Sequence, residues 1–384
     1  MRFALLGHDE HTLPIAEALH RLGHDVSHIW DAEPCRARLG QLFPRAVRLR
    51  DWTVLLESPG IDATVVACGM DPEMRVEQLK RIAQLGGAAL VSHPVRQAVL
   101  DYFELEMIAA ETKAKLVPFC PWRWKPGMHL LREWIADMER SPVGRCEQLV
   151  IERAAGERDD ANVERYFARD VDLALSLVGD LNSISAMCPR WETIGLANLG
   201  VQMTGPAGIL VRWSIEPPEI SVGLRVSLLG PEGKATLTLP DGEDTDATLQ
   251  LPAGATANDE LADDRSTEAT LEAFVAALRG EPAWPDWHAA ARGLELADSI
   301  ELSLRKGKTI PLYNTVPSEQ GTFKGVMAAA GCFMLFASLG LLLLALVLAR
   351  FGVPHADKLP YAVAALLIIF LALQTLRFVF PRSS

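Results

Sequence analysis

Residues 1–26, MRFALLGHDEHTLPIAEALHRLGHDV, place a short apolar strand directly before a glycine and a helix. Phe3–Leu6 is the expected strand, and residues 13–22 carry apolar side chains at helical spacing. Thr12 is expected to cap this helix, and residues 25–30, DVSHIW, predict the next strand. This order of strand, glycine and helix is typical of the first unit of a doubly wound α/β fold.

The alternation of strands and helices continues to about residue 118. Apolar runs at residues 61–68 and 88–94 predict two buried parallel strands, with an amphipathic helix over residues 73–87 between them. A helix over residues 97–112 and the strand KLVPFC follow. We therefore expect residues 1–118 to form a Rossmann-like domain with a doubly wound parallel sheet.

The pattern changes after Pro121. The runs ILVRWSIE, EISVGLRVSLLG and KATLTLP predict consecutive antiparallel strands. Two helices follow an acidic, polar stretch at residues 240–268. We therefore expect residues 119–312 to form a second α/β domain with an open, mostly antiparallel sheet.

Two long apolar runs follow residue 312. Residues 325–349 are 25 consecutive residues without a charge, and residues 359–376 are 18. Each run is long enough to cross a hydrocarbon core as a helix, whereas a soluble helix normally shows a polar face. The sequence predicts a linker over residues 313–324 and a transmembrane hairpin of two helices over residues 325–380.

Basic residues around these runs predict the orientation in the membrane. They are more numerous outside the two runs than in the short connector, which favours a cytoplasmic position for both chain ends. The N-terminus lacks the apolar run of a signal peptide. We therefore expect the protein at the inner, cytoplasmic membrane, with its folded part and both termini facing the cytoplasm. The flanking basic residues are Arg305, Lys306, Lys308, Lys324, Arg377 and Arg382, against Arg350 and Lys358 in the connector.

The charge of the chain excludes one class of partner. The net charge is −12, and residues 1–324 contain 33 basic and 48 acidic residues. An acidic surface repels phosphate backbones, so nucleic acid is not an expected partner. The same negative charge disfavours electrostatic binding of the folded part to anionic lipid headgroups. The hairpin is therefore expected to anchor the protein in a membrane.

The loop between the first strand and the first helix, residues 7–12, has an unusual composition. It contains His8, Asp9, Glu10 and His11 in succession. A metal site needs three or four ligands that converge, and four adjacent residues on a tight turn rarely do so. The six cysteines form no C-x-x-C pair. The sequence therefore predicts no metal site.

Four segments match the order and spacing of a known family. They are LESPGIDATVVACGMDPEMRVEQLKRIAQLGGAALVSHPV (56–95), PWRWKPGMHLLREWI (121–135), GRCEQLVIE (144–152) and RDVDLALSLVGDLNSISA (169–186). The first segment is similar to a strand region that ends in a Glu-Lys-Pro turn, and the second to an Arg-Phe-x-Pro segment. The third is similar to the first strand of the second domain's sheet, and the fourth to a helix that contains His-Asp-x-Asp. On this pattern, residues 1 to about 312 resemble the glucose–fructose oxidoreductase / inositol dehydrogenase family, Gfo/Idh/MocA.

This resemblance implies a Rossmann domain, an α/β domain with an open sheet, and NAD or NADP as the cofactor. It also implies hydride transfer to or from a hydroxyl or carbonyl of a sugar, a cyclitol or a related small molecule. Members of the family commonly pair through the open sheet, which implies a homo-oligomer. The hairpin is not part of the usual family pattern.

The resemblance assigns cofactor binding to the glycine loop. A dinucleotide fingerprint is G-x-G-x-x-G, of which Gly7 remains, whereas Asp9 and Thr12 replace the second and third glycines. The implied cofactor positions are therefore Gly7, His8, Asp9 and Thr12, with Asp31 at the end of the second strand for the ribose hydroxyls. The alternative is that the acidic side chains fill the anion site themselves and that Asp31 is only a turn residue.

The Glu-Lys-Pro turn of the family corresponds to Ser92, His93 and Pro94. His93 keeps a titratable donor at the position where the family has its lysine, near the nicotinamide and the substrate. Ser92 and Pro94 are expected beside the cofactor. The alternative is a structural histidine before a turn proline.

The helix that carries the acid/base histidine in the family is altered here. Asp170 and Asp172 align with its last two acids, and Arg169 replaces the histidine. The implied catalytic residues are therefore His93, Arg169 and Asp170, with Asp172 facing the substrate. Arginine is a poor proton acceptor and would serve better as a clamp for an anion. The alternative is that the two aspartates cap a helix and that Arg169 pairs with one of them.

Arg123, Trp124 and Lys125 cluster in the segment PWRWKPG, at the expected cleft between the domains. Aromatic faces and cations suit a sugar or an anionic sugar, so these residues are expected to bind the substrate. The alternative is tryptophan packing at a domain hinge.

Two functions are consistent with these observations. The first is a membrane-anchored, NAD(P)-dependent oxidoreductase-like protein for a sugar-like or cyclitol substrate, with degenerate active-site motifs. The second is a non-catalytic pseudoenzyme that acts as a ligand-binding or scaffold protein at the cytoplasmic membrane face. The scaffold favours the first, and the replaced glycines, lysine and histidine favour the second.

Overall fold

A computed structural model describes residues 1–69, 71–93, 99–218, 223–241, 247–252, 261, 264–282, 284–312 and 350. Met1–Leu312 form one compact unit. Within the described ranges, no helix is both long enough and apolar enough to cross a membrane. The predicted linker and the two apolar runs of the predicted hairpin lie outside these ranges.

The first sheet has six parallel strands in the order β3-β2-β1-β4-β5-β6. The chain therefore crosses from β3 to β4 on the other side of β1, and the carboxyl ends of β1 and β4 lie side by side. The predicted doubly wound parallel sheet is confirmed. Its strands are β1 (Arg2–Leu6), β2 (Asp25–Trp30), β3 (Val47–Arg48), β4 (Ala63–Val66), β5 (Ala88–Ser92) and β6 (Lys115–Phe119).

Helices cover both faces of this sheet, because alternate side chains of β1 enter two different cores. Phe3 and Leu5 pack with residues of α1, α2 and the late helix α8 (Ser266–Leu278). Ala4 and Leu6 pack with residues of α3, α4 and the late helix α9 (Trp287–Lys306). The helices of this part are α1 (Thr12–Arg21), α2 (Arg36–Leu42), α3 (Pro72–Gln84) and α4 (Val99–Thr112), with the short 3₁₀ turns η1 (Glu33–Cys35) and η2 (Trp52–Glu57).

The start of α1 differs from the prediction. Thr12 is the first residue of the helix and not its cap, and the capping residue is His11, whose side chain makes no capping hydrogen bond. The reason is that the Thr12 hydroxyl turns back and donates to the Asp9 carboxylate at 3.1 Å. A threonine at this position looks like a cap in sequence, but a nearby carboxylate is the stronger acceptor.

The second sheet has eight strands in the order β13-β12-β11-β7-β10-β9-β8-β14. All neighbouring strands are antiparallel except β7 and β10, which are parallel, so the expected open and mostly antiparallel sheet is confirmed. The strands are β7 (Gln148–Ala154), β8 (Ser183–Met187), β9 (Gly200–Thr204), β10 (Leu210–Glu216), β11 (Gly223–Gly230), β12 (Gly233–Pro240), β13 (Thr248–Gln250) and β14 (Ile310–Pro311).

The sequence predicted the antiparallel direction of consecutive strands and left their order in the sheet open. β10 and β11 follow each other in the chain but are not neighbours in the sheet, because β7 lies between them and pairs with both. The alternation of buried and exposed side chains identifies the two faces of a strand and does not identify its neighbours.

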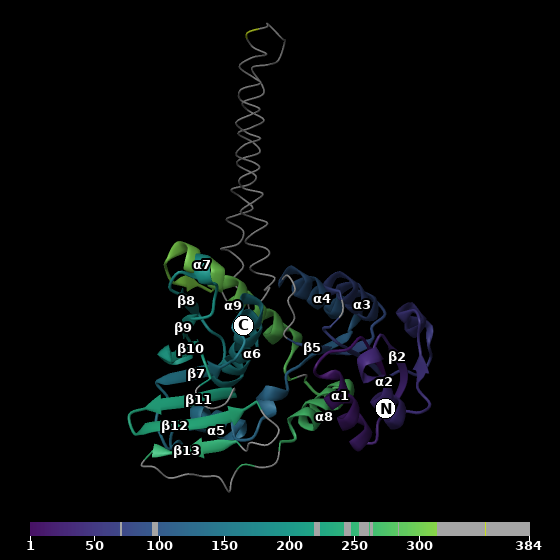
Figure 1. The fold of residues 1–384 in the computed structure, drawn as a ribbon, viewed down its shortest axis with the longest axis horizontal. Coiled ribbons are helices and arrows are strands. Elements are labelled where there is room, and N and C mark those ends of the chain that lie inside the picture. The colour runs from purple at the N-terminus through teal and green to yellow at the C-terminus, as the bar shows by residue number, and fades with distance from the viewer. Residues whose placement is uncertain are drawn as a thin grey trace, which may run out of the picture. The chain divides into compact units, whose positions relative to one another are not determined.

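Two long helices, α6 (Asp160–Val178) and α9 (Trp287–Lys306), pack against each other beside the second sheet (Figure 1). α9 also contacts α4, and α8 (Ser266–Leu278) contacts α1 and β6. The expected domain boundary at residue 118 falls at the end of β6. The helices α8 and α9 come after this boundary in the chain but pack against the first sheet or its helices. The remaining helical segments are η3 (Pro121–Trp124), α5 (Met128–Ala136), α7 (Trp191–Ile194) and η4 (Pro206–Gly208).

Candidate functional site

The glycine loop lies at the carboxyl ends of β1 and β4, where a doubly wound sheet binds its ligand. Gly7 has a φ of 78°, which suits the first glycine of a dinucleotide loop. The Asp9 carboxylate accepts hydrogen bonds from the His11 N–H at 2.9 Å and from the Thr12 hydroxyl at 3.1 Å. It also accepts the Cys68 N–H, in the loop after β4, at 2.8 Å. Asp9 therefore fills the anion position at the start of α1 with its own charge.

Electrostatics favour the ionised form of Asp9. Burial acts to raise the pKa of this carboxyl, but the neighbouring Ser92 hydroxyl, the Cys68 N–H and His11 outweigh burial and hold the pKa below its usual value. The Ser92 hydroxyl faces Asp9 without meeting the distance and angle of a hydrogen bond. The carboxylate is therefore anionic at neutral pH, and it already occupies the N–H and O–H donors that a phosphate at the start of α1 would need.

The two loops that flank this position touch each other. A Cβ added to Gly69 would lie 2.0 Å from the carbonyl oxygen of His8, so only glycine lets the backbones approach this closely. Pro14, in the first turn of α1, has no N–H to offer a phosphate. A pyrophosphate bound in the usual Rossmann manner therefore does not fit the loop in this conformation.

Asp31 and His8 are placed together by the structure. Asp31 follows β2 with a φ of 50°, its side chain is exposed, and its carbonyl oxygen lies 2.9 Å from His8 Nδ1. An exposed acid at this point is suited to ribose hydroxyls. A role in cofactor binding stays a prediction for both residues.

His93 follows β5 and is buried, with 2% of its surface exposed. Burial lowers its pKa to about 4, so the ring is neutral at physiological pH. His93 Nδ1 lies 3.4 Å from the hydroxyl of Tyr102, whose own pKa burial raises to about 12. The tyrosine therefore keeps its proton at physiological pH, and its hydroxyl and His93 Nδ1 share one hydrogen bond whose direction depends on the tautomer of the imidazole. Pro94, predicted beside it, lies outside the described residues.

The two aspartates of the altered helix lie in the middle of α6 and do not cap it, since the capping residue is Asp159. Asp172 accepts Arg123 Nε at 2.9 Å, Arg123 Nη2 at 2.5 Å and Trp122 Nε1 at 2.9 Å. Burial acts to raise the pKa of Asp172, but the Arg123 guanidinium outweighs it and holds the pKa below its usual value. Two residues expected to bind the substrate are thus paired with each other inside the protein.

Asp170 is paired in the same way, with a residue that the sequence did not suggest. It accepts two hydrogen bonds from Arg153 of β7 and one from Trp213 Nε1 at 3.0 Å. The alternative that Arg169 pairs with one of the two aspartates is confirmed as a longer ion pair, since Arg169 Nε lies 3.9 Å from Asp170. A catalytic role for Asp170 stays a prediction, and its carboxylate is saturated by donors.

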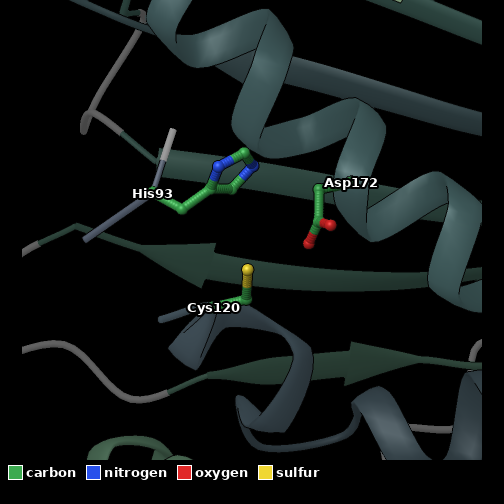
Figure 2. A group of neighbouring side chains, drawn as sticks. All are labelled: His93, Cys120 and Asp172. Atoms are coloured by element: carbon green, nitrogen blue, oxygen red, sulfur yellow. The ribbon is translucent and has the colours of Figure 1, made fainter. Parts of the chain in front are cut away.

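His93, Asp172 and Cys120 form a buried group with one potential ligand atom each, all within 4.8 Å of one another. Figure 2 shows the imidazole, the carboxylate and the thiol pointing from three different segments into the same space. Burial raises the pKa of Cys120 well above its usual value, which keeps the thiol protonated. Because the Asp172 carboxylate already accepts three donors, this donor set is poorly suited to a metal ion.

The other residues of the PWRWKPG segment lie on the outer side of η3. Lys125 pairs with Asp264, and the Trp124 ring meets Trp284 edge to face at 4.9 Å. The Arg132 guanidinium lies 4.7 Å from the centre of the same Trp284 ring. This arrangement matches the tryptophan packing considered from the sequence, and substrate binding by Trp124 and Lys125 stays a prediction.

Arg169 borders a small cavity of about 110 Å³ between the glycine loop, the end of β5 and α6. Its guanidinium lies 5.6 Å from the centre of the Trp122 ring and 5.7 Å from that of Tyr166. The small cavity is lined by Asp9, Glu10, His11, Cys68, Ser92, His93, Trp122, Arg165, Tyr166 and Arg169. It therefore brings together four residues expected from the sequence at the cofactor or catalytic site: Asp9, Ser92, His93 and Arg169. Trp122, from the PWRWKPG segment, lies beside them.

A larger hollow of about 860 Å³ lies between α6, α7, α9 and the loop after β4. Cys68 and Arg165 line both spaces, so the small cavity and the large hollow adjoin. Sequence reasoning missed Tyr166 and Cys68; it aligned Arg165 with the first aspartate of the family's helix motif but did not assign it to the site. Arg165 lies one helical turn before Arg169 on α6, and this i, i+4 spacing of two arginines was a signal that could have drawn attention to it.

No protein-family model matches the sequence, and no curated protein matches it either. Solved structures do match. A myo-inositol dehydrogenase from Corynebacterium glutamicum has a TM-score of 0.66 at 18% identity, over 82% of this chain and 99% of the other. A UDP-N-acetylglucosamine 3-dehydrogenase from Acidithiobacillus ferrooxidans has a TM-score of 0.65 at 18% identity, over 80% and 98%.

A third similar structure is the WlbA dehydrogenase from Chromobacterium violaceum, solved with NADH and UDP-GlcNAcA. Its TM-score is 0.63 at 17% identity, over 82% of this chain and 96% of the other. These structural neighbours are dehydrogenases of the Gfo/Idh/MocA type. At such low identity the likeness establishes the fold, and the expected Rossmann-like and open-sheet architecture is that of these neighbours.

Proposed function

We propose that this chain is a Gfo/Idh/MocA-type protein that binds a sugar-like or cyclitol ligand and does not oxidise it. One observation carries the proposal. The Asp9 carboxylate occupies the anion position at the start of α1, held by His11, Thr12 and Cys68. A dehydrogenase of this fold needs that position for the pyrophosphate of its cofactor.

The neighbouring side chains support a binding role. The two aspartates of α6 are saturated by buried donors, and Arg169 is a poor proton acceptor at the position of the acid/base histidine. His93 is buried and neutral, and its ring is held by Tyr102. What remains accessible is the large hollow beside the small cavity, which is big enough for a sugar-sized molecule.

The place of action in this proposal is the cytoplasmic face of the inner membrane. Support comes from the sequence of residues 325–380, with its two uncharged runs, and from the basic residues that flank them. The proposed partners are accordingly the membrane, a small sugar-like molecule and a second copy of the chain, paired through the open sheet.

An NAD(P)-dependent oxidoreductase is the second candidate. Gly7 keeps the backbone of a dinucleotide loop, and Asp31 presents an exposed carboxylate at the end of β2. Two similar structures were solved with the cofactor, one with NAD⁺ and one with NADH. For NAD to bind here, Asp9 must leave its three donors and the loop must open.

Titration of the purified full chain with NADH and NADPH, by fluorescence and calorimetry, separates the two candidates. We expect weak or absent binding, because the displaced charged hydrogen bonds cost about 1–3 kcal/mol each, roughly tenfold or more in affinity. We also expect no turnover of common sugars and cyclitols with either cofactor. Micromolar binding with one site per chain would establish the second candidate instead.

A pair of variants tests the role of the loop directly. Asp9→Gly combined with Thr12→Gly restores the glycines of the fingerprint, and gain of cofactor affinity would identify an eroded phosphate site. Asp25→Gly is the matched control, because Asp25 is an exposed aspartate at the start of β2 and away from the loop. It should leave cofactor affinity unchanged.

A further inference from the structure

Arg169 has one N–H group at the small cavity for which the structure describes no hydrogen-bond partner. Its Nε is buried and makes no hydrogen bond to any residue in the described part of the chain, although the side chain as a whole is 23% exposed. Its ion-pair partner, Asp170, lies 3.9 Å away and already accepts hydrogen bonds from Arg153 and Trp213. A guanidinium with an unused N–H group favours an anion that can accept it.

The acids that line the same cavity do not satisfy this charge. Asp9 is used by three donors of its own loops. Glu10 pairs with Arg165 at 3.7 Å, in an exposed ion pair. The Ser92 hydroxyl, 1% exposed, makes no close hydrogen bond to a described residue, but it acts on Asp9 and lowers the pKa of that carboxyl. A polar group of the cavity that remains unused among the residues that the structure describes is therefore Arg169 Nε, which suits a carboxylate.

The size of the cavity limits what enters it. A volume of about 110 Å³ admits a group of a few heavy atoms, since a water molecule occupies about 30 Å³ of liquid. A carboxylate and its adjacent carbon fit this description. The Glu10–Arg165 pair is the most exposed part of the lining, with 57% and 48% of the side chains accessible. Exposed surface pairs of this kind contribute little stability, so this pair can separate to admit a ligand.

The large hollow continues from the small cavity at Cys68 and Arg165 and has a different character. Polar side chains such as Asn162 and Asp298 face it together with the apolar surfaces of Trp191 and Leu294. Carboxylate and amide groups bind hydroxyls, and an aromatic face packs on the C–H side of a sugar ring or chain. The hollow therefore suits a hydroxylated carbon skeleton.

We infer that the ligand is a polyhydroxy carboxylate, an aldonate or a uronate, whose carboxylate binds Arg169 in the small cavity and whose hydroxyls lie in the large hollow. The inference rests on the proposed binding function and names its ligand class. It accounts for the arginine at the position of a catalytic base, because Arg169 then recognises a charge and moves no proton.

Calorimetry on the purified full chain at pH 7 tests the inference. The acidic probes are gluconate and glucuronate, and the neutral probes are sorbitol and methyl glucoside. We expect an acidic probe to bind about tenfold or more tightly than its neutral counterpart, from one charge-assisted arginine pair. Equal affinity for both would overturn the inference and leave the binding function intact. Failure of all four probes to bind would also overturn it.

Variants identify the residue that recognises the charge. Arg169→Gln should weaken binding of the acidic probe by about tenfold or more and leave the neutral probe unchanged. Arg169→Lys keeps the charge and should keep part of the preference, which guards against a mere packing defect beside Trp122. Arg212→Gln, on an exposed position of β10, is the matched control and should change neither affinity. Equal loss for acidic and neutral probes in Arg169→Gln would overturn the assignment.

The cofactor titration is a separate readout. Micromolar binding of NADH would contradict the proposed function, whether or not the chain binds acidic probes more tightly than neutral ones. Weak NADH binding together with equal affinity for acidic and neutral probes would contradict only the inference about the carboxylate.

Discussion

The Asp9 carboxylate joins two loops that are far apart in the chain, because it accepts the N–H of Cys68 at 2.8 Å. One loop follows β1 and the other follows β4, at the point where strand order reverses in the first sheet. In a dinucleotide-binding protein this gap is spanned by the cofactor. Here a side chain of the protein spans it, so the loops are joined without a ligand.

We predict that Asp9→Asn destabilises the protein by about 1–3 kcal/mol, because hydrogen bonds to a charged acceptor are replaced by weaker ones. Chemical denaturation measures the loss, with Asp25→Asn as an exposed control. The pKa of Asp9 is held below its usual value of 3.8. The contribution of ionised Asp9 to the free energy of unfolding is therefore present above pH 3.8. It is lost as the pH falls through the lower pKa that Asp9 has in the folded protein. A difference from the wild type that persists unchanged far below pH 3.8 would contradict this account.

The position of Asp9 could be predicted from the sequence, but its partners could not. Its place two residues after Gly7 follows from the strand and the fingerprint spacing. The Cys68 N–H comes from a loop 59 residues away, and only the sheet order brings it close. The same holds for Arg153 and Asp170, since nothing in the strand that contains Arg153 marks it as the partner of a residue in α6.

We predict that His93 makes stability rise with pH between about 4 and 6.5. The folded pKa of about 4 lies below the usual 6.5, so the unfolded chain binds more protons in this interval. The full contribution, reached above pH 6.5, is about 3 kcal/mol. His93→Gln should flatten the pH dependence of unfolding in this interval.

The charges that face His93 act in opposite directions. Burial lowers its pKa most, Asp172 from α6 raises it, and Arg75 from α3 and Arg123 from η3 lower it. His129→Gln is the matched control, because His129 is exposed on α5. It should leave the slope unchanged, and an equal flattening in both variants would argue against His93 as the source.

We predict that Asp172→Asn destabilises the protein by about 3–5 kcal/mol, because it leaves the buried guanidinium of Arg123 without a counter-charge. Both side chains are almost fully buried, at 0% and 3% exposure. Glu133→Gln breaks the exposed pair with Arg140 and should cost no more than about 1 kcal/mol. Thermal and chemical unfolding of the two variants should therefore differ clearly. Similar losses would mean that the Arg123–Asp172 pair is not buried as described.

The fold could be predicted from the sequence as far as local patterns reach. The strand–helix alternation of residues 1–118 predicted the parallel sheet, because each parallel strand is a short apolar run followed by a helix. The insertion of β7 between β10 and β11 has no local signal, since it joins strands about 60 residues apart. The return of α8 to the first sheet is likewise a contact between distant segments, and amphipathic spacing shows only that the helix has a buried face.

We predict that Phe274→Ala in α8 destabilises the first sheet by about 3–5 kcal/mol. Phe274 is fully buried, and its ring lies 6.4 Å from that of Phe3 in β1. Truncation of this ring leaves a cavity in a core that α8 shares with the first 119 residues of the chain, and Phe3 lies 271 residues before Phe274. Leu100→Ala is the matched control, because Leu100 is 77% exposed and should change stability by less than about 0.5 kcal/mol. Hydrogen exchange of the β1 amides in the two variants shows where the stability is lost. Equal protection of the β1 amides in both variants would show that α8 does not belong to the core that packs on β1.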